Sequence, residues 1–113
     1  KKNYLVPDLK KNIKKAKKKI TLKDLNHYRD FISMNDISKI IFYLYKKKFN
    51  GIVNIGSGKA ILLKDIATTI SKYYNKKIEF NDNKKKTYLV ANINKLKRIY
   101  KKKITQKIEQ LIF

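Results

Sequence analysis

Strand-like and helix-like segments alternate along this chain, and that order constrains its fold more than any other feature of the sequence. Short apolar runs predict strands at residues 20–22, 31–34, 52–55, 78–80 and 88–90. Apolar residues three and four positions apart predict helices over residues 8–18, 35–45, 62–73, 92–99 and 105–112. This alternation favours a small, layered, mixed α/β (α+β) domain over a helical bundle or a barrel. A chain of 113 residues is expected to form one domain, over residues 1–113, with one modest core.

The apolar faces of these helices predict where that core lies. The helix that follows Asn35-Asp36, an N-cap and a first-turn acid, is expected to bury Ile37, Ile40, Ile41, Leu44 and Tyr45. The helix over 62–73 is expected to end near Asn75. Core packing rather than base stacking is expected for the aromatic residues Phe42, Tyr43, Tyr45, Tyr73 and Tyr74.

The net charge of +22 suggests phosphate neutralisation, so a small Lys-rich nucleic-acid-binding module is one hypothesis. Against it, only Arg29 and Arg98 are arginine among the 30 basic residues, whereas proteins that read phosphates and bases favour the guanidinium fork. Lys, Asn and Ile together supply about half of the chain, a bacterial-like mixture expected of an AT-rich genome. We therefore interpret the charge mainly as a solvated surface, and nucleic acid is not the expected partner.

The absence of cysteine excludes a disulfide framework, a thiolate metal site and a cysteine nucleophile. No apolar run approaches the roughly 20 residues that span a bilayer, and the Lys-rich start lacks the apolar stretch of a signal peptide. A cytoplasmic protein without a membrane partner is expected. Because the first residue is Lys rather than Met, the chain is also expected to belong to a longer polypeptide.

Residues 54–59, Asn-Ile-Gly-Ser-Gly-Lys, form a Gly-x-Gly turn between a predicted strand and a predicted helix. Glycines let backbone N–H groups approach an anion near a helix start, so a phosphate contact is one interpretation. The Walker and dinucleotide patterns are not met, because the glycines are too close together and no third glycine follows. A tight structural turn is the other interpretation, and spacing alone favours it.

A search of the residues for an active site finds none. Arg29 precedes a predicted strand and suits a bidentate contact with a diphosphate, and an ordinary ion pair with Asp30, Asp36 or another acid is the alternative. His27 is the single histidine, and we interpret it as a surface residue. The eight acidic residues show no spacing typical of two-carboxylate hydrolysis or of a metal site.

Four segments, taken in order, resemble a known family. They are Arg29 to Ile37 (Arg-Asp-Phe-Ile-Ser-Met-Asn-Asp-Ile), Gly51 to Gly58 (Gly-Ile-Val-Asn-Ile-Gly-Ser-Gly), Leu63 to Ala67 (Leu-Lys-Asp-Ile-Ala) and Val90 to Leu96 (Val-Ala-Asn-Ile-Asn-Lys-Leu). Their order and spacing are similar to the C-terminal part of the NAD-dependent epimerase/dehydratase group, which acts on nucleotide sugars within the extended short-chain dehydrogenase/reductase superfamily. The match covers most of the chain.

The resemblance implies a parent enzyme whose N-terminal Rossmann domain binds NAD or NADP and whose smaller C-terminal portion holds the nucleotide sugar. The catalytic Tyr-x-x-x-Lys lies before the matched region, Tyr4 does not begin that motif, and the Gly-rich cofactor loop is missing. This chain would therefore hold no catalytic residue, cofactor or metal. By the same resemblance Arg29 would contact the substrate diphosphate, Asn54 would shape the pocket, and Lys86 would supply a second phosphate contact.

The sequence also departs from the family. Residues 23–26, Lys-Asp-Leu-Asn, replace the usual Gly-Asp-Gly turn, and residues 83–86, Asn-Lys-Lys-Lys, stand where many members have Arg-Pro-Gly. The leading hypothesis is the substrate-binding region of an epimerase, dehydratase or reductase, with the Lys-rich nucleic-acid-binding module and a scaffolding domain without a ligand as alternatives. Surfaces that pack on the Rossmann portion in relatives would be bared, so exposed apolar patches and a homodimer are expected.

Overall fold

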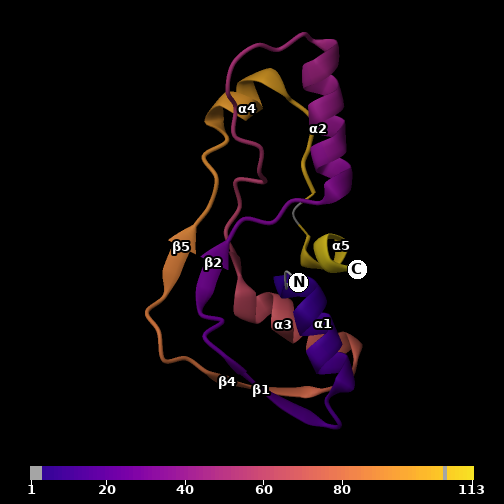
Figure 1. Cartoon of the computed structure of the whole chain (residues 1–113), viewed down its shortest axis with the longest axis vertical. Helices are drawn as coiled ribbons and strands as arrows, with labels where there is room; N and C mark the ends of the chain where they lie inside the picture. The colour runs from indigo at the N-terminus through magenta and orange to yellow at the C-terminus, as the bar shows by residue number, and fades with distance from the viewer. Residues whose placement is uncertain (1–3, 106) are drawn as a thin grey trace.

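A computed structural model describes residues 4–105 and 107–113 and gives the chain an elongated shape of 51 × 28 × 27 Å. Its elements, in order, are α1 (Leu5–Lys15), β1 (Lys19–Lys23), β2 (His27–Arg29), α2 (Met34–Lys46), β3 (Ile61–Leu62), α3 (Leu63–Tyr73), β4 (Lys77–Asn81), β5 (Thr87–Leu89), α4 (Asn94–Ile99) and α5 (Ile108–Ile112). Helices α2 and α4 lie at one end of the long axis, and α1, α3, β1 and β4 lie at the other (Figure 1). The radius of gyration, 16.5 Å, exceeds the roughly 13 Å of a compact domain of this length.

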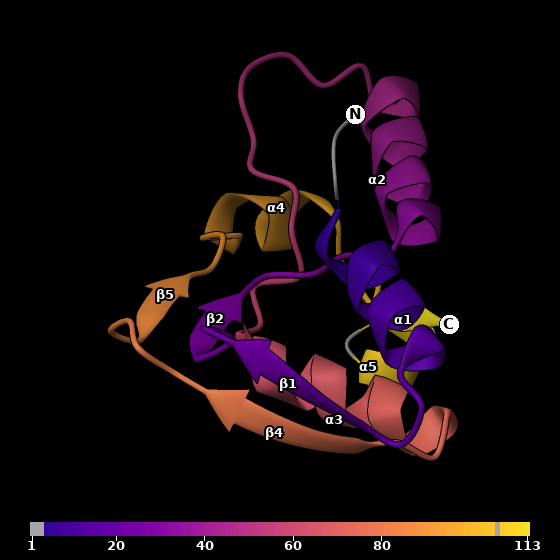
Figure 2. The ribbon, with the colours of Figure 1, turned by 60° about the horizontal axis from the view of Figure 1, so that its bottom comes forward.

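Two small sheets carry the strands. Strand β1 runs parallel to β4, with Ile20 opposite Ile78. Strand β2 lies between β3, which is antiparallel to it, and β5, which is parallel. Parallel neighbours need a crossover connection, and the helices between the paired strands provide it. Figure 2 shows β1 and β4 side by side with α3 next to them. The layered mixed α/β class predicted from the alternation is confirmed.

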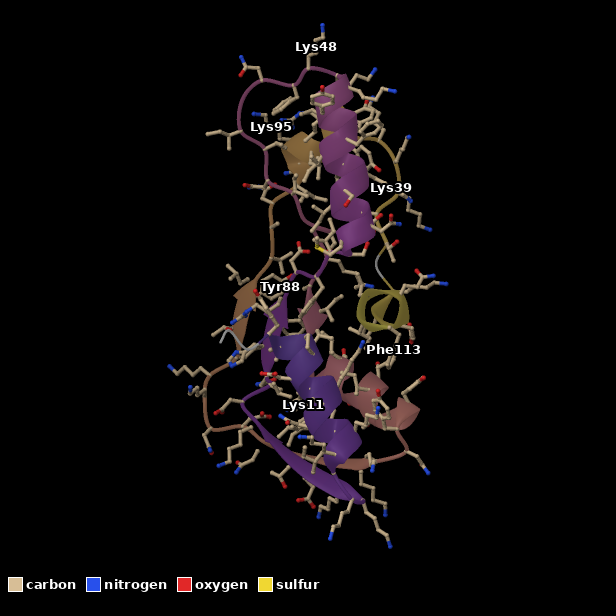
Figure 3. All side chains as sticks on the ribbon, turned by 45° about the vertical axis from the view of Figure 1, so that its right-hand side comes forward. Lys11, Lys39, Lys48, Tyr88, Lys95 and Phe113 are labelled. Carbon is tan, nitrogen blue, oxygen red and sulfur yellow. The ribbon has the colours of Figure 1, made fainter. Side chains whose placement is uncertain are left out.

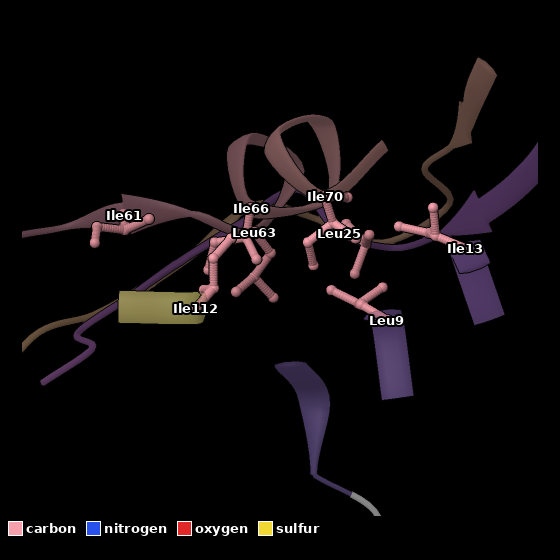
Figure 4. Packing of buried hydrophobic residues seen from close by; sticks show 9 residues of the cluster. Leu9, Ile13, Leu25, Ile61, Leu63, Ile66, Ile70 and Ile112 are labelled. Atoms are coloured by element: carbon pink, nitrogen blue, oxygen red, sulfur yellow. The ribbon is translucent and has the colours of Figure 1, made fainter. Parts of the chain in front are cut away.

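The larger apolar cluster is built on α3. Ile66 and Ile70 are fully buried on the helix face that their spacing predicts. Leu9 and Ile13 of α1 and Ile112 of α5 pack against the same cluster (Figure 4). Replacing a buried Leu or Ile by Ala typically costs about 2–5 kcal/mol, so each of these side chains contributes substantially to holding α1 and α5 on α3.

A second apolar cluster lies at the α2 end, so the expectation of one core is wrong. Ile40 of α2 and Leu96 of α4 are buried there with Tyr100. The ring of Tyr43 meets that of Tyr100 edge to face, with centroids 5.2 Å apart. These contacts cover the side of α2 that faces α4 and the segment after it.

The predicted buried face of α2 is only partly correct. Ile40 is buried and Leu44 is partly buried, but Ile41 and Tyr45 are 54% and 79% exposed. Core packing is likewise wrong for Phe42 and Tyr73, which are mostly exposed, although Tyr43 and Tyr74 pack partly against the clusters. For Ile41, Phe42 and Tyr45 the physical reason is that α2 is apolar around more of its circumference than the described residues cover.

The predicted strand at 31–34 is wrong. The strand lies earlier, at β2, and Ser33 is the N-cap of α2, where Asn35-Asp36 was predicted. The Ser33 hydroxyl accepts a hydrogen bond from the N–H of Asp36 at 3.0 Å, which satisfies one of the unpaired donors at the helix start.

The predicted strand at 52–55 is also wrong. These residues pair with no strand of the described chain, and the Ile52 side chain is 85% exposed. The Ile52 carbonyl accepts instead from the Lys95 ammonium at 2.6 Å. A β-branched run forms a strand only where a neighbour supplies ladder hydrogen bonds, and here the neighbour is missing.

The remaining differences concern helix boundaries. Helix α1 begins at Leu5 rather than residue 8 and ends at Lys15, and Pro7 is tolerated because first-turn N–H groups need no intrahelical partner. Helix α5 begins after Lys107 rather than at Thr105, whose N–H donates to Asp36 Oδ2 at 3.0 Å. Of the helices in the described residues, none combines the length and apolar character that a membrane crossing demands.

Candidate functional site

The carboxylate of Asp30 joins three parts of the chain at the exit of β2. Its Oδ1 accepts hydrogen bonds from the N–H of Ser57 at 2.9 Å and from the Ser57 hydroxyl at 2.7 Å. Its Oδ2 accepts from the N–H groups of Gly58 at 2.9 Å and Ala91 at 3.3 Å. The carboxylate thus supplies these backbone N–H groups with the acceptors that a neighbouring strand would supply in a sheet. It holds the glycine turn and the segment after β5 beside the end of β2.

Two glycines permit this close approach. A Cβ on Gly56 would lie 2.8 Å from the Cβ of Ala91, and Gly58 has φ of +72° with Ile93 carbons 2.8 Å from its Cβ position. The N–H groups of Ser57 and Gly58 donate to a carboxylate of the chain itself rather than to a bound anion. These contacts support the structural interpretation of the Gly-x-Gly turn over the phosphate interpretation.

A shallow cleft of about 600 Å³ lies beside this junction. Its walls are Arg29 and Asp30, residues 53–55 and residues 89–92. The structure therefore brings together Arg29 and Asn54, two of the three residues that the resemblance predicts as the site. The Nδ2 of Asn54 donates to the carbonyl of Asn92 at 3.3 Å, which ties two walls of the cleft together.

The guanidinium of Arg29 is anchored through one nitrogen. Its Nη1 donates to the carbonyl of Tyr28 at 2.7 Å and to Oγ1 of Thr87 at 2.9 Å. Within residues 4–105 and 107–113, Arg29 forms no ion pair with a carboxylate, so the alternative of an ordinary ion pair is not what the structure contains. Arginine carries five N–H donors, and those on Nε and Nη2 lie outside these two bonds.

Thr87 links Arg29 to His27. The Thr87 hydroxyl oxygen lies 2.7 Å from His27 Nδ1, and the Thr87 N–H donates to the same ring nitrogen at 3.2 Å. A ring nitrogen that accepts from an N–H carries no proton, so Nδ1 is the acceptor in the contact with the Thr87 N–H. Sequence reasoning missed Thr87, because only the parallel register places it opposite His27.

Lys86 lies apart from the cleft. Its ammonium stands 5.3 Å from the centroid of the Tyr28 ring. Successive side chains of a strand point to opposite faces, so Tyr28 and the ammonium beside it lie on the face of the sheet opposite to Arg29. The structure does not bring Lys86 together with Arg29 and Asn54.

The pattern Tyr-x-x-x-Lys does occur in this chain, at Tyr43–Lys47 and Tyr73–Lys77. The inference from Tyr4 that the chain lacks this pattern is therefore wrong. Tyr73 ends α3 and Lys77 begins β4, so this pair does not share a helix face. Tyr43 and Lys47 do share one on α2, but the Lys47 ammonium lies over the Tyr43 ring, 5.7 Å from its centroid. Both line a groove that has no residue in common with the Arg29 cleft.

The glycine turn at residues 56–58 is not arranged as a dinucleotide site. A dinucleotide site needs a glycine-rich turn whose N–H groups face the pyrophosphate at a helix start. The N–H groups of Ser57 and Gly58 are instead bonded to Asp30, as described above. Within the part of the chain that the structure describes, no group of three or more His, Asp or Glu side chains could hold a metal ion.

No protein-family model matches this chain, but its fold is similar to part of several solved structures. GDP-mannoheptose C4 reductase from Campylobacter jejuni, with NADP bound, matches with a TM-score of 0.81 and 17% identity over 99% of this chain and 43% of that one. dTDP-glucose 4,6-dehydratase from Bacillus anthracis, in complex with NAD, matches with a TM-score of 0.75 and 22% identity over 96% of this chain and 36% of the dehydratase. UDP-glucose 4-epimerase from Bifidobacterium longum, in complex with NAD⁺ and UDP, matches with a TM-score of 0.70 and 14% identity over 96% of this chain and 37% of the epimerase.

The chain thus has the fold of the C-terminal part of NAD(P)-dependent epimerases, dehydratases and reductases, as the resemblance predicts. It spans 36% to 43% of the length of the three enzymes named above.

Proposed function

We propose that this chain is the nucleotide-sugar-binding portion of an NAD(P)-dependent epimerase, dehydratase or reductase, and that the cleft beside Arg29 receives the substrate diphosphate. The observation that carries the proposal is a guanidinium anchored through Nη1 alone, on a residue that lines the same cleft as Asn54. In this proposal a separate Rossmann portion supplies the nicotinamide, which exchanges hydride with the sugar, and the groups that move the proton.

A diphosphate suits Arg29 because the guanidinium fork can donate parallel N–H bonds to two phosphate oxygens. The neighbouring Asp30 carboxylate would repel an anion, but four hydrogen-bond donors already stabilise its charge. The net charge of +22 favours an anion at longer range. Asn54 keeps Oδ1 outside its bond to Asn92 as an acceptor for a hydroxyl group.

Lys86 has a smaller part in this proposal. It precedes the edge strand β5 but lies on the opposite face from Arg29, beside the Tyr28 ring. We expect it to attract the substrate through solvent without a direct contact, an effect that salt screens.

An exposed apolar stripe on α2 supports the existence of a second portion. Met34, Ile41 and Tyr45 recur at helical spacing on one face and are all mostly exposed, as is Ile52 in the following loop. A stripe of this kind marks an interaction surface. We assign it to the Rossmann portion, and self-association of the 113-residue chain through the same stripe is the alternative that sedimentation would reveal.

Calorimetric titration of the chain with UDP-glucose tests the proposal. We expect Arg29→Ala to weaken binding by about tenfold, the worth of a charge-assisted hydrogen bond, and Arg29→Lys to restore only part of it. Arg98→Ala is the matched control, because Arg98 is exposed on α4 and its replacement removes the same charge. Equal affinities for the two alanine variants would show that the diphosphate does not bind in this cleft. Binding of NAD that Arg29→Ala abolishes would contradict the assignment of the cofactor to another portion.

A further inference from the structure

A second groove, lined by lysines and aromatic rings, runs between α2 and the segment after α4. One face of α2 supplies its first wall, because Lys39, Phe42, Tyr43, Lys46 and Lys47 recur at the three- and four-residue spacing of a helix. The segment after α4 supplies the other wall with Tyr100 and two lysines. Figure 1 shows that segment running beside α2, and Figure 3 shows Lys39 on α2. The groove has a volume of about 670 Å³, within the range of small-molecule sites.

The lining of this groove combines positive charge with aromatic rings. Single lysines lie over single rings elsewhere, as Lys10 does over Phe113, but this groove brings five lysines and three aromatic rings together. The Lys46 ammonium lies 5.4 Å from the centroid of the Phe42 ring, and that of Lys47 lies 5.7 Å from the Tyr43 centroid. Phe42 keeps 61% of its surface in water, so its ring is available to a ligand.

We propose that this groove binds one free nucleoside polyphosphate, with the base against the Phe42 ring and the phosphates against the lysines. Stacking on an aromatic face and neutralisation by ammonium groups are the two contacts that such a ligand needs. The described lining consists of Lys, Phe and Tyr alone, so it offers no amide or carboxylate to read a base edge. Its side-chain donors are lysine ammonium and tyrosine hydroxyl groups, which can reach acceptors on any base, so we expect little discrimination among bases. Its volume and its single exposed ring suit one nucleotide rather than a strand, which would need a longer track with several stacking platforms.

This site is independent of the Arg29 cleft, because the two linings share no residue. The two proposals therefore fail separately. Arg29→Ala should leave binding in the groove unchanged, and Phe42→Ala should leave UDP-glucose binding in the cleft unchanged.

Fluorescence-detected competition on the chain, with a fluorescent ATP analogue as the reporter, tests the groove. The competitors are ATP, GTP, inorganic tripolyphosphate and an oligothymidylate of six nucleotides. We expect ATP and GTP to compete equally, tripolyphosphate to be about tenfold weaker because it lacks the stacking contact, and all competition to weaken as salt is added. Tripolyphosphate equal to ATP would overturn the proposal, as would an oligothymidylate that binds more tightly than ATP and depends on Phe42.

Matched variants locate the site. Phe42→Ala should lower the affinity for ATP about tenfold, whereas Tyr45→Ala, on the exposed stripe of the same helix, should leave it unchanged. Replacing Lys46 and Lys47 by Gln should lower the affinity for ATP more than replacing Lys10 and Lys11 by Gln, which removes the same charge from α1. Circular dichroism verifies that each variant is folded. Equal effects of the two lysine pairs would mean that net charge alone binds ATP and would refute the groove.

Discussion

Asp30→Ala tests whether one carboxylate holds the candidate site together. The substitution removes the acceptor for the N–H and hydroxyl of Ser57 and for the N–H groups of Gly58 and Ala91. Ser57 is buried, so water cannot fully replace its two lost bonds. Gly58 is exposed and can turn to solvent. The destabilisation therefore comes mainly from Ser57 and, in part, from Ala91.

The magnitude follows from these contacts. A hydrogen bond to a charged group contributes about 1.5–3 kcal/mol, and a buried donor left without a partner costs about 1–3 kcal/mol. For Asp30→Ala we expect a loss of about 2–4 kcal/mol, a large fraction of the stability of a small domain. Asp30→Asn should lose about half as much, because the amide keeps one acceptor but sets its NH₂ against two N–H donors.

Urea unfolding followed by circular dichroism measures this loss. With a slope of about 1.5 kcal/mol per molar urea, the midpoint of Asp30→Ala should fall by roughly 1.3–2.7 M. Glu79→Gln is the control, because it removes one carboxylate from an exposed ion pair with Lys19, and such pairs contribute about 0–1 kcal/mol. Both substitutions raise the net charge equally. If Asp30→Ala destabilises no more than Glu79→Gln, the carboxylate does not organise the junction.

Three further predictions concern packing and pH. Gly56→Ala should destabilise the chain by about 1–3 kcal/mol in urea, because its Cβ would collide with Ala91; an unchanged midpoint would show that the turn gives way freely. Ile40→Ala should cost about 2–5 kcal/mol and Ile41→Ala less than about 1 kcal/mol, and similar losses would contradict the assigned faces of α2. The hydrogen bond from the N–H of Asn83, followed by that from Lys84, lowers the pKa of Asp24 below 3.8, so its stabilisation is present above that pH and is lost as the pH falls through the folded value. Acid titration of Asp24→Asn should therefore show a weaker loss of stability below about pH 4 than the parent chain, and identical titrations would refute the contribution.

Elements with strong local signals could be predicted from the sequence. Helix α3 follows from the spacing of Leu63, Ile66, Ala67 and Ile70, and its end follows from Asn75, which adopts φ of +55° where a helix commonly stops. Strand β4 follows from the alternation of Ile78 and Phe80. In each case the residues that decide the conformation lie within a few positions of one another.

Features that depend on distant partners could not be predicted. Residues 52–55 have the composition of a buried strand, yet no described strand pairs with them. The residues of α2 that point away from α4 look as apolar as those that face it, so the sequence could not say which side is covered. Arg29 was identified through the resemblance, but the role of Asp30 emerges only when the fold places Ser57, 27 residues later, against its carboxylate.

The most direct test of the central claim is a map of the backbone amides that respond to UDP in ¹⁵N–¹H spectra of the chain. The account predicts saturable shifts at Arg29, Asn54, Ile55 and Ala91, all at the walls of the cleft, and their disappearance in Arg29→Ala. Shifts confined to other surfaces, or shifts at the cleft that survive the loss of Arg29, would contradict it.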